Sequence, residues 1–554
     1  MNENKRVVDL ANRKRNTAGV VSEDGQNYRK ECILSQIVPE RNAAKHRSRT
    51  CHIHDLECYD LTYNCIGISV KNMVGNRNRS FRDMLHTLYR KIVELTNIQS
   101  GGIGFINFDS DIAPYIGNES DGEIQEAFHE LFLDLNMSTR KGCENPYVTF
   151  NFGLDTSTNG RRASFLLLDA YEKGDERGNP FVFPNIVFKM KSGVNLEKNT
   201  PNFDLYTRAL SVTAKRMVPT YFNCDSISNA EYLAQTIGIM GCRTRVVTNV
   251  NGREGSLNRG NVACVTLNLV QMAYMAEGSI DTFYSILDEN LYDAKEVLLH
   301  RFNTLCEKGL FEEYYGKGYY QGNEKNDARE MLKNGTLSIG FIGLWDAIGT
   351  LMGCEIDSVE IMDRYFDLAY GIISHMREYT DQLTREEHLN ISLLATAAEG
   401  VTGNFAKYDS LNLGKGFMAC KKGFYTNSFH VPVSMNINYK DKIQFEGRFH
   451  RLCNGGSITY VELKEMPGRN VEAIREVVEC AYQNDCNYIG VNFPMDNCID
   501  CGYTGRIVEK CPCCNSNKIR RLRRVSGYLS EESSFTAGKK KELRERVPQF
   551  SMQQ

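Results

Sequence analysis

The chain has 554 residues and a mass of 62.9 kDa, enough for one large core or for several ordinary domains. Hydrophobic residues make up 42% and charged residues 24% of the chain, proportions that exclude an extended disordered protein. The formal net charge of −3 excludes a general basic surface for a nucleic-acid backbone. The N-terminus carries charge without the apolar stretch of a signal peptide, so we expect a cytoplasmic protein, or a host-cytoplasmic one if a virus encodes it.

Helical and strand patterns alternate along most of the chain. Apolar residues recur at helical spacing over 82–95 and 123–135. Runs rich in β-branched and aromatic residues predict strands at 147–154, 185–190, 264–270, 457–463 and 488–493. The most apolar stretch, 337–354, contains several glycines and Asp346, which argues against a membrane span. The alternation predicts a large α/β architecture around a buried sheet.

The C-terminal part of the chain has a different composition. It contains a cluster of cysteines, a run of basic residues over 518–524 and a polar tail with further lysines. We therefore predict a domain boundary near Met495. The expected divisions are a catalytic domain over 1–495, a four-cysteine ribbon over 496–518, and a final segment over 519–554.

Cysteine usage is high, at nineteen residues, and five of them fall between Cys498 and Cys514. A disulfide scaffold is typical of small secreted domains, which this chain is not. Cys498, Cys501, Cys511 and Cys514 form two C-x2-C pairs, a spacing that lets four sulfurs surround one tetrahedral ion. We predict a structural zinc site. The alternatives are four unliganded thiols and a redox-active iron–sulfur site.

A ribbon followed by basic residues also occurs in nucleic-acid-binding proteins, which supplies a second hypothesis for function. Against it, the ribbon and tail are a small part of the chain, and a short basic run is more typical of a solvated surface. We expect no direct nucleic-acid binding.

The segment 524–529, RVSGYL, resembles the glycyl-radical motif of anaerobic (class III) ribonucleotide reductases, which follows a four-cysteine zinc site. Other segments resemble that family in the same order along roughly residues 10 to 550. They are HIHDL at 52–56, NC at 64–65, NPYVTFN at 145–151, MGCRT at 240–244, GN at 260–261, TLNL at 266–269, IGFIGL at 339–344 and YTNSFH at 425–430.

The resemblance implies a fold and a radical reaction. The fold would be a ten-stranded α/β barrel of two five-stranded parallel halves, with the zinc ribbon and the glycyl-radical loop at the C-terminus. Removal of a ribose 2′-hydroxyl requires breaking an unactivated C–H bond, which acids and bases cannot do but radicals can. Gly527 would store the radical, Cys242 would form the thiyl radical that attacks the substrate, and Cys65 would deliver hydrogen from the opposite face.

The product would be 2′-deoxyribonucleoside triphosphates for DNA synthesis, made from ribonucleoside triphosphates. Family members take two electrons either from formate or from a small redox protein, and Met240 with Asn261 resembles the formate type. For substrate binding we expect Asn64, His54, Ser428 and Ser338, with phosphates held at helix N-termini near a glycine-rich turn over 338–343 and near Ser428.

The resemblance also implies partners and effectors. We expect a homodimer with deoxynucleoside triphosphates or ATP as allosteric effectors. The HIHDL segment comes too early to leave room for an N-terminal ATP-binding domain. The chain has no Cys-x3-Cys-x2-Cys cluster, so we expect a separate activating enzyme with an iron–sulfur cluster and S-adenosylmethionine.

Two points stay open at this level. A glycyl-radical lyase of the pyruvate formate-lyase type would share the barrel, although such lyases generally lack the four cysteines. His52 and His54, two residues apart, are metal ligands in one interpretation and core or supporting residues in the other. We expect Gly527→Ala to survive air after activation and to make no deoxynucleotide, but to fold and bind zinc normally.

Overall fold

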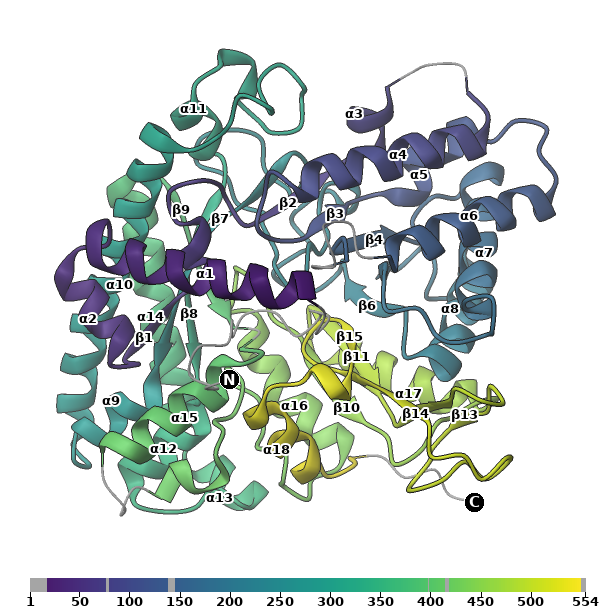
Figure 1. Ribbon diagram of the computed structural model, residues 1–554. Helices are drawn as coiled ribbons and strands as arrows, with labels where there is room; N and C mark the ends of the chain where they lie inside the picture. The colour runs from purple at the N-terminus through teal and green to yellow at the C-terminus, as the bar shows by residue number, and fades with distance from the viewer. Residues whose placement is uncertain (1–16, 76–78, 138–144, 397, 414–417, 550–554) are drawn as a thin grey trace.

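The structure is a computed structural model that describes residues 17–75, 79–137, 145–396, 398–413 and 418–549. Its central feature is a barrel of ten strands (Figure 1). The barrel strands are β2 (Cys65–Ile68), β3 (Ile103–Phe105), β4 (Val148–Phe152), β5 (Asn185–Met190), β6 (Thr220–Asn223), β7 (Arg259–Asn268), β8 (Thr336–Ile342), β9 (Asn390–Ala395), β10 (Thr459–Glu462) and β11 (Tyr488–Asn492).

The barrel consists of two parallel halves, as predicted. Strands β2 to β6 form one half, with every neighbouring pair parallel. Strands β7 to β11 form the other, in which a single parallel bridge between Leu394 and Gly456 links β9 to the start of β10. The halves meet at two antiparallel seams, β2 with β7 and β6 with β11, and β1 (Cys51–Ile53) pairs with the far end of β7.

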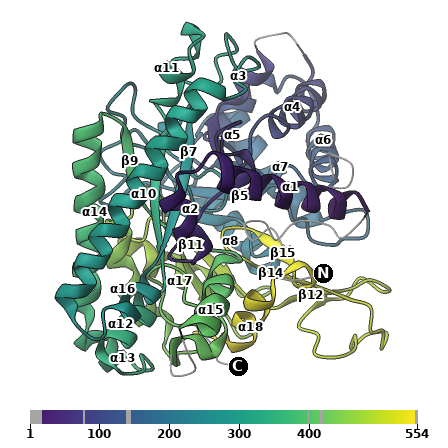
Figure 2. The ribbon, with the colours of Figure 1, turned by 60° about the vertical axis from the view of Figure 1, so that its left-hand side comes forward.

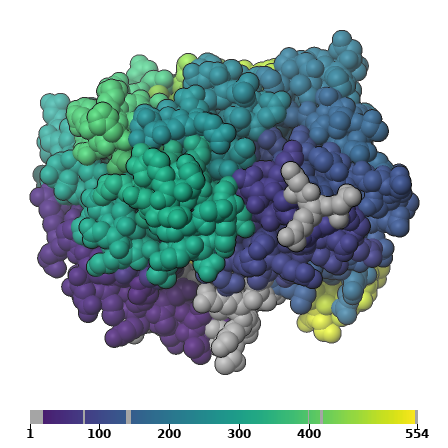
Figure 3. Space-filling model, turned by 90° about the horizontal axis from the view of Figure 1, so that it is seen from above, coloured from purple at the N-terminus to yellow at the C-terminus, as the bar shows by residue number. Residues whose placement is uncertain are grey.

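Helices cover the outside of the barrel, with α4, α6, α7 and α8 on one side and α10, α12 and α14 on the other (Figures 1 and 2). Together with the N-terminal helices they form one continuous body (Figure 3). Within the described residues, no helix is both long and apolar enough to cross a membrane. The helices are α1 (Thr17–Gln36), α2 (Glu40–Arg47), α3 (Val70–Val74), α4 (Phe81–Thr96), α5 (Phe108–Ile112), α6 (Asp121–Leu135), α7 (Thr158–Lys173), α8 (Phe203–Arg216), α9 (Leu269–Met275), α10 (Ile280–Lys308), α11 (Ala328–Leu332), α12 (Leu344–Met352), α13 (Val359–Arg364), α14 (Phe366–Glu387), α15 (Val401–Asn412), α16 (Tyr439–His450), α17 (Val471–Gln483) and α18 (Ala537–Glu545).

The middle of the segment between β6 and β7, residues 237–246 of 224–258, lies inside the barrel, while Ile227, Leu233 and Val250 on either side of it are exposed. Glycines on the inner face of the first half make room for it: a Cβ added at Gly104 would lie 2.8 Å from the Met240 side chain and 2.9 Å from the Ile239 carbonyl oxygen. Asn151 of β4 holds the segment, because its amide group donates to the Ile239 carbonyl (2.8 Å) and accepts from the Ile239 amide (2.8 Å). We call residues 237–246 the finger loop.

The C-terminal residues form a second sheet of four strands, in the order β13-β12-β14-β15. These strands are β12 (Met495–Cys498), β13 (Thr504–Gly505), β14 (Ile519–Arg524) and β15 (Leu529–Glu531). The sheet begins at Met495, where the sequence predicted a boundary, and it runs through both the predicted ribbon and the predicted final segment. The division of the chain into three domains stays a prediction.

Most predicted elements exist close to their expected bounds. The helix over 82–95 is α4, the helix over 123–135 is α6, and the strand over 185–190 is β5. Ser120 and Glu123 form a capping box that fixes the start of α6. The prediction of a glycine-rich turn over 338–343 is wrong for residues 338–342, because these residues belong to the buried strand β8. Its glycine at 340 lies where a Cβ would be 2.1 Å from the Thr396 hydroxyl oxygen.

Candidate functional site

A cavity of about 180 Å³ is lined by the start of β2, by β7 on the other side of the antiparallel seam, and by the end of β9. Five of the predicted site residues line it, from segments far apart in the sequence. They are His54, Asn64, Cys65, Cys242 and Asn261. The fold therefore brings together the two cysteines to which the family resemblance gives separate steps of one reaction, although 177 positions separate them in the sequence.

The finger loop carries Cys242 to the cavity on a tight turn. The Met240 amide donates to the Thr244 carbonyl at 3.1 Å, and Gly241 between them has a φ of +62°. Thr149 of β4 donates to the Gly241 carbonyl at 3.2 Å. The main chain on the N-terminal side of Cys242 is thereby fixed by the barrel wall.

Arg243 fixes the loop on the other side of Cys242. Its buried guanidinium donates to the carbonyl oxygens of Ala395 and Thr396 and to the Tyr460 hydroxyl, each at 3.2 Å. These partners lie at β9 and β10, across from the strand that holds Gly241. Cys242 is consequently held between the two halves of the barrel.

Cys65 stands at the start of β2, directly opposite Asn261 in the antiparallel seam with β7. Its thiol donates to the Asn64 side-chain oxygen at 2.6 Å, and its sulfur accepts the Gly102 amide at 3.3 Å. A Cβ added at Gly241 would lie 3.3 Å from the Cys65 sulfur, so the finger loop passes directly beside it.

Burial governs the chemical state of both thiols. Desolvation raises the pKa of Cys65, and it raises the pKa of Cys242 despite the neighbouring Arg243, while the carboxylate of Glu399 adds to the increase. Both residues are therefore thiols that carry hydrogen at neutral pH rather than thiolates. This state suits hydrogen-atom transfer and disfavours nucleophilic or metal-binding chemistry.

Polar side chains fix the remaining cavity residues. Asn64 donates to the carboxylate of Asp55, and His54 forms a 2.8 Å hydrogen bond with the hydroxyl of Thr266. Asn261 donates to the hydroxyl of Ser338 at 2.7 Å. The amide groups that line the cavity are therefore held in place by barrel side chains.

Gly527, described below, and three other predicted catalytic or substrate-binding residues do not line this cavity. Met240 is fully buried and packs against Cys65 and Val246. Ser338 lies within β8 and supports Asn261 from behind. Ser428 is fully buried, its φ is +40°, and its hydroxyl has no hydrogen-bond partner among the described residues. Met240 and Ser338 thus contact residues that line the cavity without lining it themselves, whereas Ser428 bonds through its carbonyl oxygen to the Leu344 amide.

Gly527 lies in the turn between β14 and β15, in which the Val525 amide donates to the Tyr528 carbonyl at 3.0 Å. A Cβ added at Gly527 would lie 1.6 Å from the Cys242 carbonyl oxygen and 2.5 Å from the Cys242 Cα. The two main chains are therefore in contact. The expectation that Gly527→Ala folds normally is wrong for this turn, because a methyl group would overlap main-chain atoms that the barrel holds rigidly.

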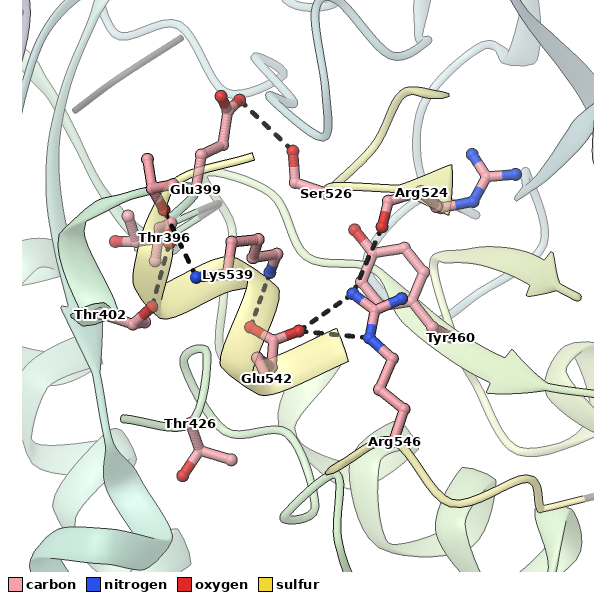
Figure 4. A network of polar contacts seen from close by, with 12 residues as sticks. Thr396, Glu399, Thr402, Thr426, Tyr460, Arg524, Ser526, Lys539, Glu542 and Arg546 are labelled. Carbon is pink, nitrogen blue, oxygen red and sulfur yellow. Dashed lines mark hydrogen bonds and ion pairs between the residues drawn. The ribbon is translucent and has the colours of Figure 1, made fainter. Parts of the chain in front are cut away.

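Glu399, just before α15, is a site residue that the sequence did not indicate. It lines the cavity, and its carboxylate accepts hydrogen bonds from the Tyr528 hydroxyl (2.7 Å) and the Ser526 hydroxyl (3.5 Å; Figure 4). Tyr528 also packs edge-on against Tyr147, another cavity residue, with ring centroids 5.0 Å apart. Glu399 thus connects the cavity to the residues on both sides of Gly527.

The four predicted metal ligands come together in the C-terminal sheet. The sulfurs of Cys498, Cys501, Cys511 and Cys514 all lie within 4.8 Å of one another, a spacing that suits four thiolates around one zinc ion. Among the described residues this is the only group of three or more ligand-type side chains close enough to hold a metal. His52 instead packs edge-on against His54, with ring centroids 4.7 Å apart.

Asp496 ties this cysteine cluster to the glycine turn. Its buried carboxylate pairs with Arg521 (3.0 Å) and Arg523 (2.7 Å) of β14 and accepts the Ile507 amide at 2.8 Å. Strand β12, which ends at Cys498, pairs with β14, and β14 pairs with β15 across the turn. A metal that orders the ribbon would thereby also order the turn.

Comparisons with known proteins agree with this geometry. A family model described as anaerobic ribonucleoside-triphosphate reductase matches residues 9–548. The chain is 29% identical to the anaerobic ribonucleoside-triphosphate reductase of Escherichia coli (strain K12), with 96% of this chain and 80% of that protein covered. It is 28% identical to the protein of the same name from Enterobacteria phage T4, with 96% and 93% covered.

A solved structure has the same fold. It is the anaerobic ribonucleotide reductase from Thermotoga maritima in complex with dATP and CTP, which matches with a TM-score of 0.75 at 17% identity and covers 94% of this chain and 91% of that chain. The family model extends over nearly the whole sequence and includes every residue of the cavity and of the cysteine cluster. The chain therefore belongs to the family of anaerobic ribonucleoside-triphosphate reductases.

Proposed function

We propose that the chain reduces ribonucleoside triphosphates by radical chemistry that begins at Gly527, passes through Cys242 and uses Cys65 and formate. The observation that carries this proposal is the main-chain contact between Gly527 and Cys242 at the wall of a cavity that Cys65 also lines. Reacting groups must share one substrate, and this contact makes a hydrogen-atom transfer between neighbouring residues feasible.

The proposed sequence of steps uses each thiol once. A radical at Gly527 takes the hydrogen atom of the Cys242 thiol, and the resulting thiyl radical takes the 3′-hydrogen of the ribose. The 2′-hydroxyl then leaves as water, and Cys65 supplies hydrogen at C2′. The proton lost with the water comes from the 3′-hydroxyl, which leaves a carbonyl at C3′. The Cys65 thiyl radical takes the hydrogen atom of formate, and the resulting carbon dioxide radical anion gives its electron to this carbonyl, which takes up a proton, so that carbon dioxide is released. Cys242 then returns a hydrogen atom to C3′ and takes the hydrogen atom of Gly527, which restores the radical there.

Support for formate comes from Asn261, which lines the cavity opposite Cys65, and from Met240, which packs against the same cysteine. Both positions match the formate type of the family. The amide group of Asn261 is held by Ser338, so it presents a fixed polar surface to a small substrate.

The remaining parts of the proposal concern metal, partners and effectors. Zinc held by the four cysteines would have a structural role, because the shared sheet connects the cluster to the turn of Gly527. A separate S-adenosylmethionine-dependent enzyme would generate the radical, and the protein would act as a homodimer. The dATP and CTP named for the Thermotoga maritima structure support deoxynucleotide effectors and ribonucleotide substrates here as well.

The test is an anaerobic assay with the activated protein, a ribonucleoside triphosphate and ¹³C-formate. We expect one labelled carbon dioxide for each deoxynucleotide, and we expect Cys65→Ser and Cys242→Ser each to abolish both products. Cys480→Ser, a partly buried thiol on α17 away from the cavity, is the matched control and should retain activity. Deoxynucleotide without labelled carbon dioxide would reject formate, and activity in Cys242→Ser would reject the thiyl step.

A further inference from the structure

Arg524, at the end of β14, is a buried cation whose hydrogen-bond partners are all neutral. Only 1% of its surface is exposed. Its guanidinium donates to the Asn492 side-chain oxygen (2.7 Å), to the Met217 carbonyl, and to the carbonyl oxygen of Gly527 (3.3 Å). It forms no ion pair within the described parts of the chain, which is costly for a buried charge.

The surrounding structure is built to hold this cation in place. Gly490 of β11 lies against the guanidinium, and a Cβ at that position would be 3.3 Å from Nε of Arg524. Arg546 donates to the Arg524 main-chain carbonyl at 3.3 Å and is itself paired with Glu542 (Figure 4). It also pairs with Glu462. The carboxylates of Glu542 and Glu462 therefore neutralise Arg546. The guanidinium group of Arg524 instead donates to main-chain carbonyl oxygens and to a side-chain amide oxygen.

We propose that Arg524 polarises the carbonyl group of Gly527 and so draws unpaired electron density away from its Cα when Gly527 carries the radical. This inference rests on the proposed function. A glycyl radical is stabilised because the amide nitrogen donates electrons and the carbonyl accepts them. A cation hydrogen-bonded to the carbonyl oxygen strengthens that acceptor, since charge-assisted hydrogen bonds are stronger than neutral ones.

The experiment measures the α-proton splitting of the glycyl radical by electron paramagnetic resonance, since this splitting is proportional to the spin density at Cα. Arg524→Gln removes the charge, and Arg524→Lys keeps it. Asn492→Asp leaves Arg524 in place and puts a carboxylate beside its guanidinium. Arg520→Gln is the matched control, because it removes the same charge from another residue of β14, which pairs with the exposed Glu531 instead.

We expect a larger splitting in Arg524→Gln and in Asn492→Asp than in the wild-type protein, and a faster anaerobic loss of the radical. Arg524→Lys should lie close to wild type, and Arg520→Gln should be unchanged. Zinc content and near-ultraviolet circular dichroism would verify that each variant is folded. If Arg524→Gln accumulates no radical while Arg524→Lys does, the charge is needed for the radical to persist, which also supports the proposal.

Two results separate this inference from the proposed function. Equal splittings in wild type, Arg524→Gln and Asn492→Asp would overturn the role of Arg524 while the glycyl radical itself stands. Absence of any glycyl signal in the activated wild-type protein would instead reject the proposed function. A loss of folding confined to Arg524→Gln leaves Asn492→Asp to decide, because that variant retains the arginine.

Discussion

Tyr528→Phe removes one hydrogen bond that holds the glycine turn against the cavity. The Tyr528 hydroxyl is 2.7 Å from the carboxylate of Glu399. A hydrogen bond to a charged group contributes about 1.5–3 kcal/mol, so the free energy of opening the turn should fall by about that amount. Because about 1.4 kcal/mol corresponds to a factor of ten, the open population should rise by about ten- to one-hundred-fold.

Amide hydrogen exchange of residues 524–531, followed by mass spectrometry, measures this population directly and requires no radical. We expect the amides of the turn to exchange faster by that factor in Tyr528→Phe, with the barrel strands unchanged. Tyr147→Phe is the control: its ring contacts Tyr528, but its hydroxyl has no hydrogen-bond partner among the described residues. The reasoning fails if Tyr528→Phe exchanges like wild type, or if Tyr147→Phe exchanges just as fast.

Four further outcomes follow from the site. Air should cut the activated protein at Gly527 and release the last 27 residues, as mass spectrometry would show, because a main-chain radical combines with dioxygen, while unactivated protein should stay intact. Gly527→Ala should bind zinc but show rapid hydrogen exchange in the turn, because its Cβ would lie 1.6 Å from the Cys242 carbonyl oxygen; slow exchange would contradict this clash. Cys498→Ser or Cys511→Ser should lower zinc content, measured by atomic absorption, and prevent radical accumulation; a full radical without metal would remove the link between ribbon and turn. Burial raises the pKa of Cys65 and Cys242, so kcat/KM should not fall as pH passes the ordinary thiol pKa of 9.0, and a fall there would show accessible thiols.

The spacing of apolar residues predicted individual helices and strands well, because each of them buries the apolar residues that form the pattern. The strand β5 and the helices α4 and α6 each bury an unbroken run or stripe of apolar residues, which the sequence displays directly. Closure of the barrel is different, because its two antiparallel seams join strands that are distant in sequence. Only the family resemblance predicted that arrangement.

The site shows the same division between local and long-range information. The cysteine spacing is a local signal, and the four sulfurs do meet. Glu399 has no comparable signal, because its role depends on contact with Tyr528, 129 positions further along the chain. The prediction of a turn beginning at Ser338 is wrong, because glycine usually indicates a turn, whereas here Gly340 of β8 makes room for the side chain of Thr396.

The position of the finger loop inside the barrel, within the segment 224–258, has a consequence for how the molecule folds. This segment is also the covalent link between β6 and β7, which belong to different halves. Arg259, the first residue of β7, donates to the carbonyl oxygens of Val247, Thr248 and Gly255 within the segment and to that of Asn334 on the second half. Neither half can therefore complete its inner surface alone, and the barrel must close around a segment that is already threaded. Folding of the two halves should be a single late cooperative event, dominated by contacts between distant residues and correspondingly slow.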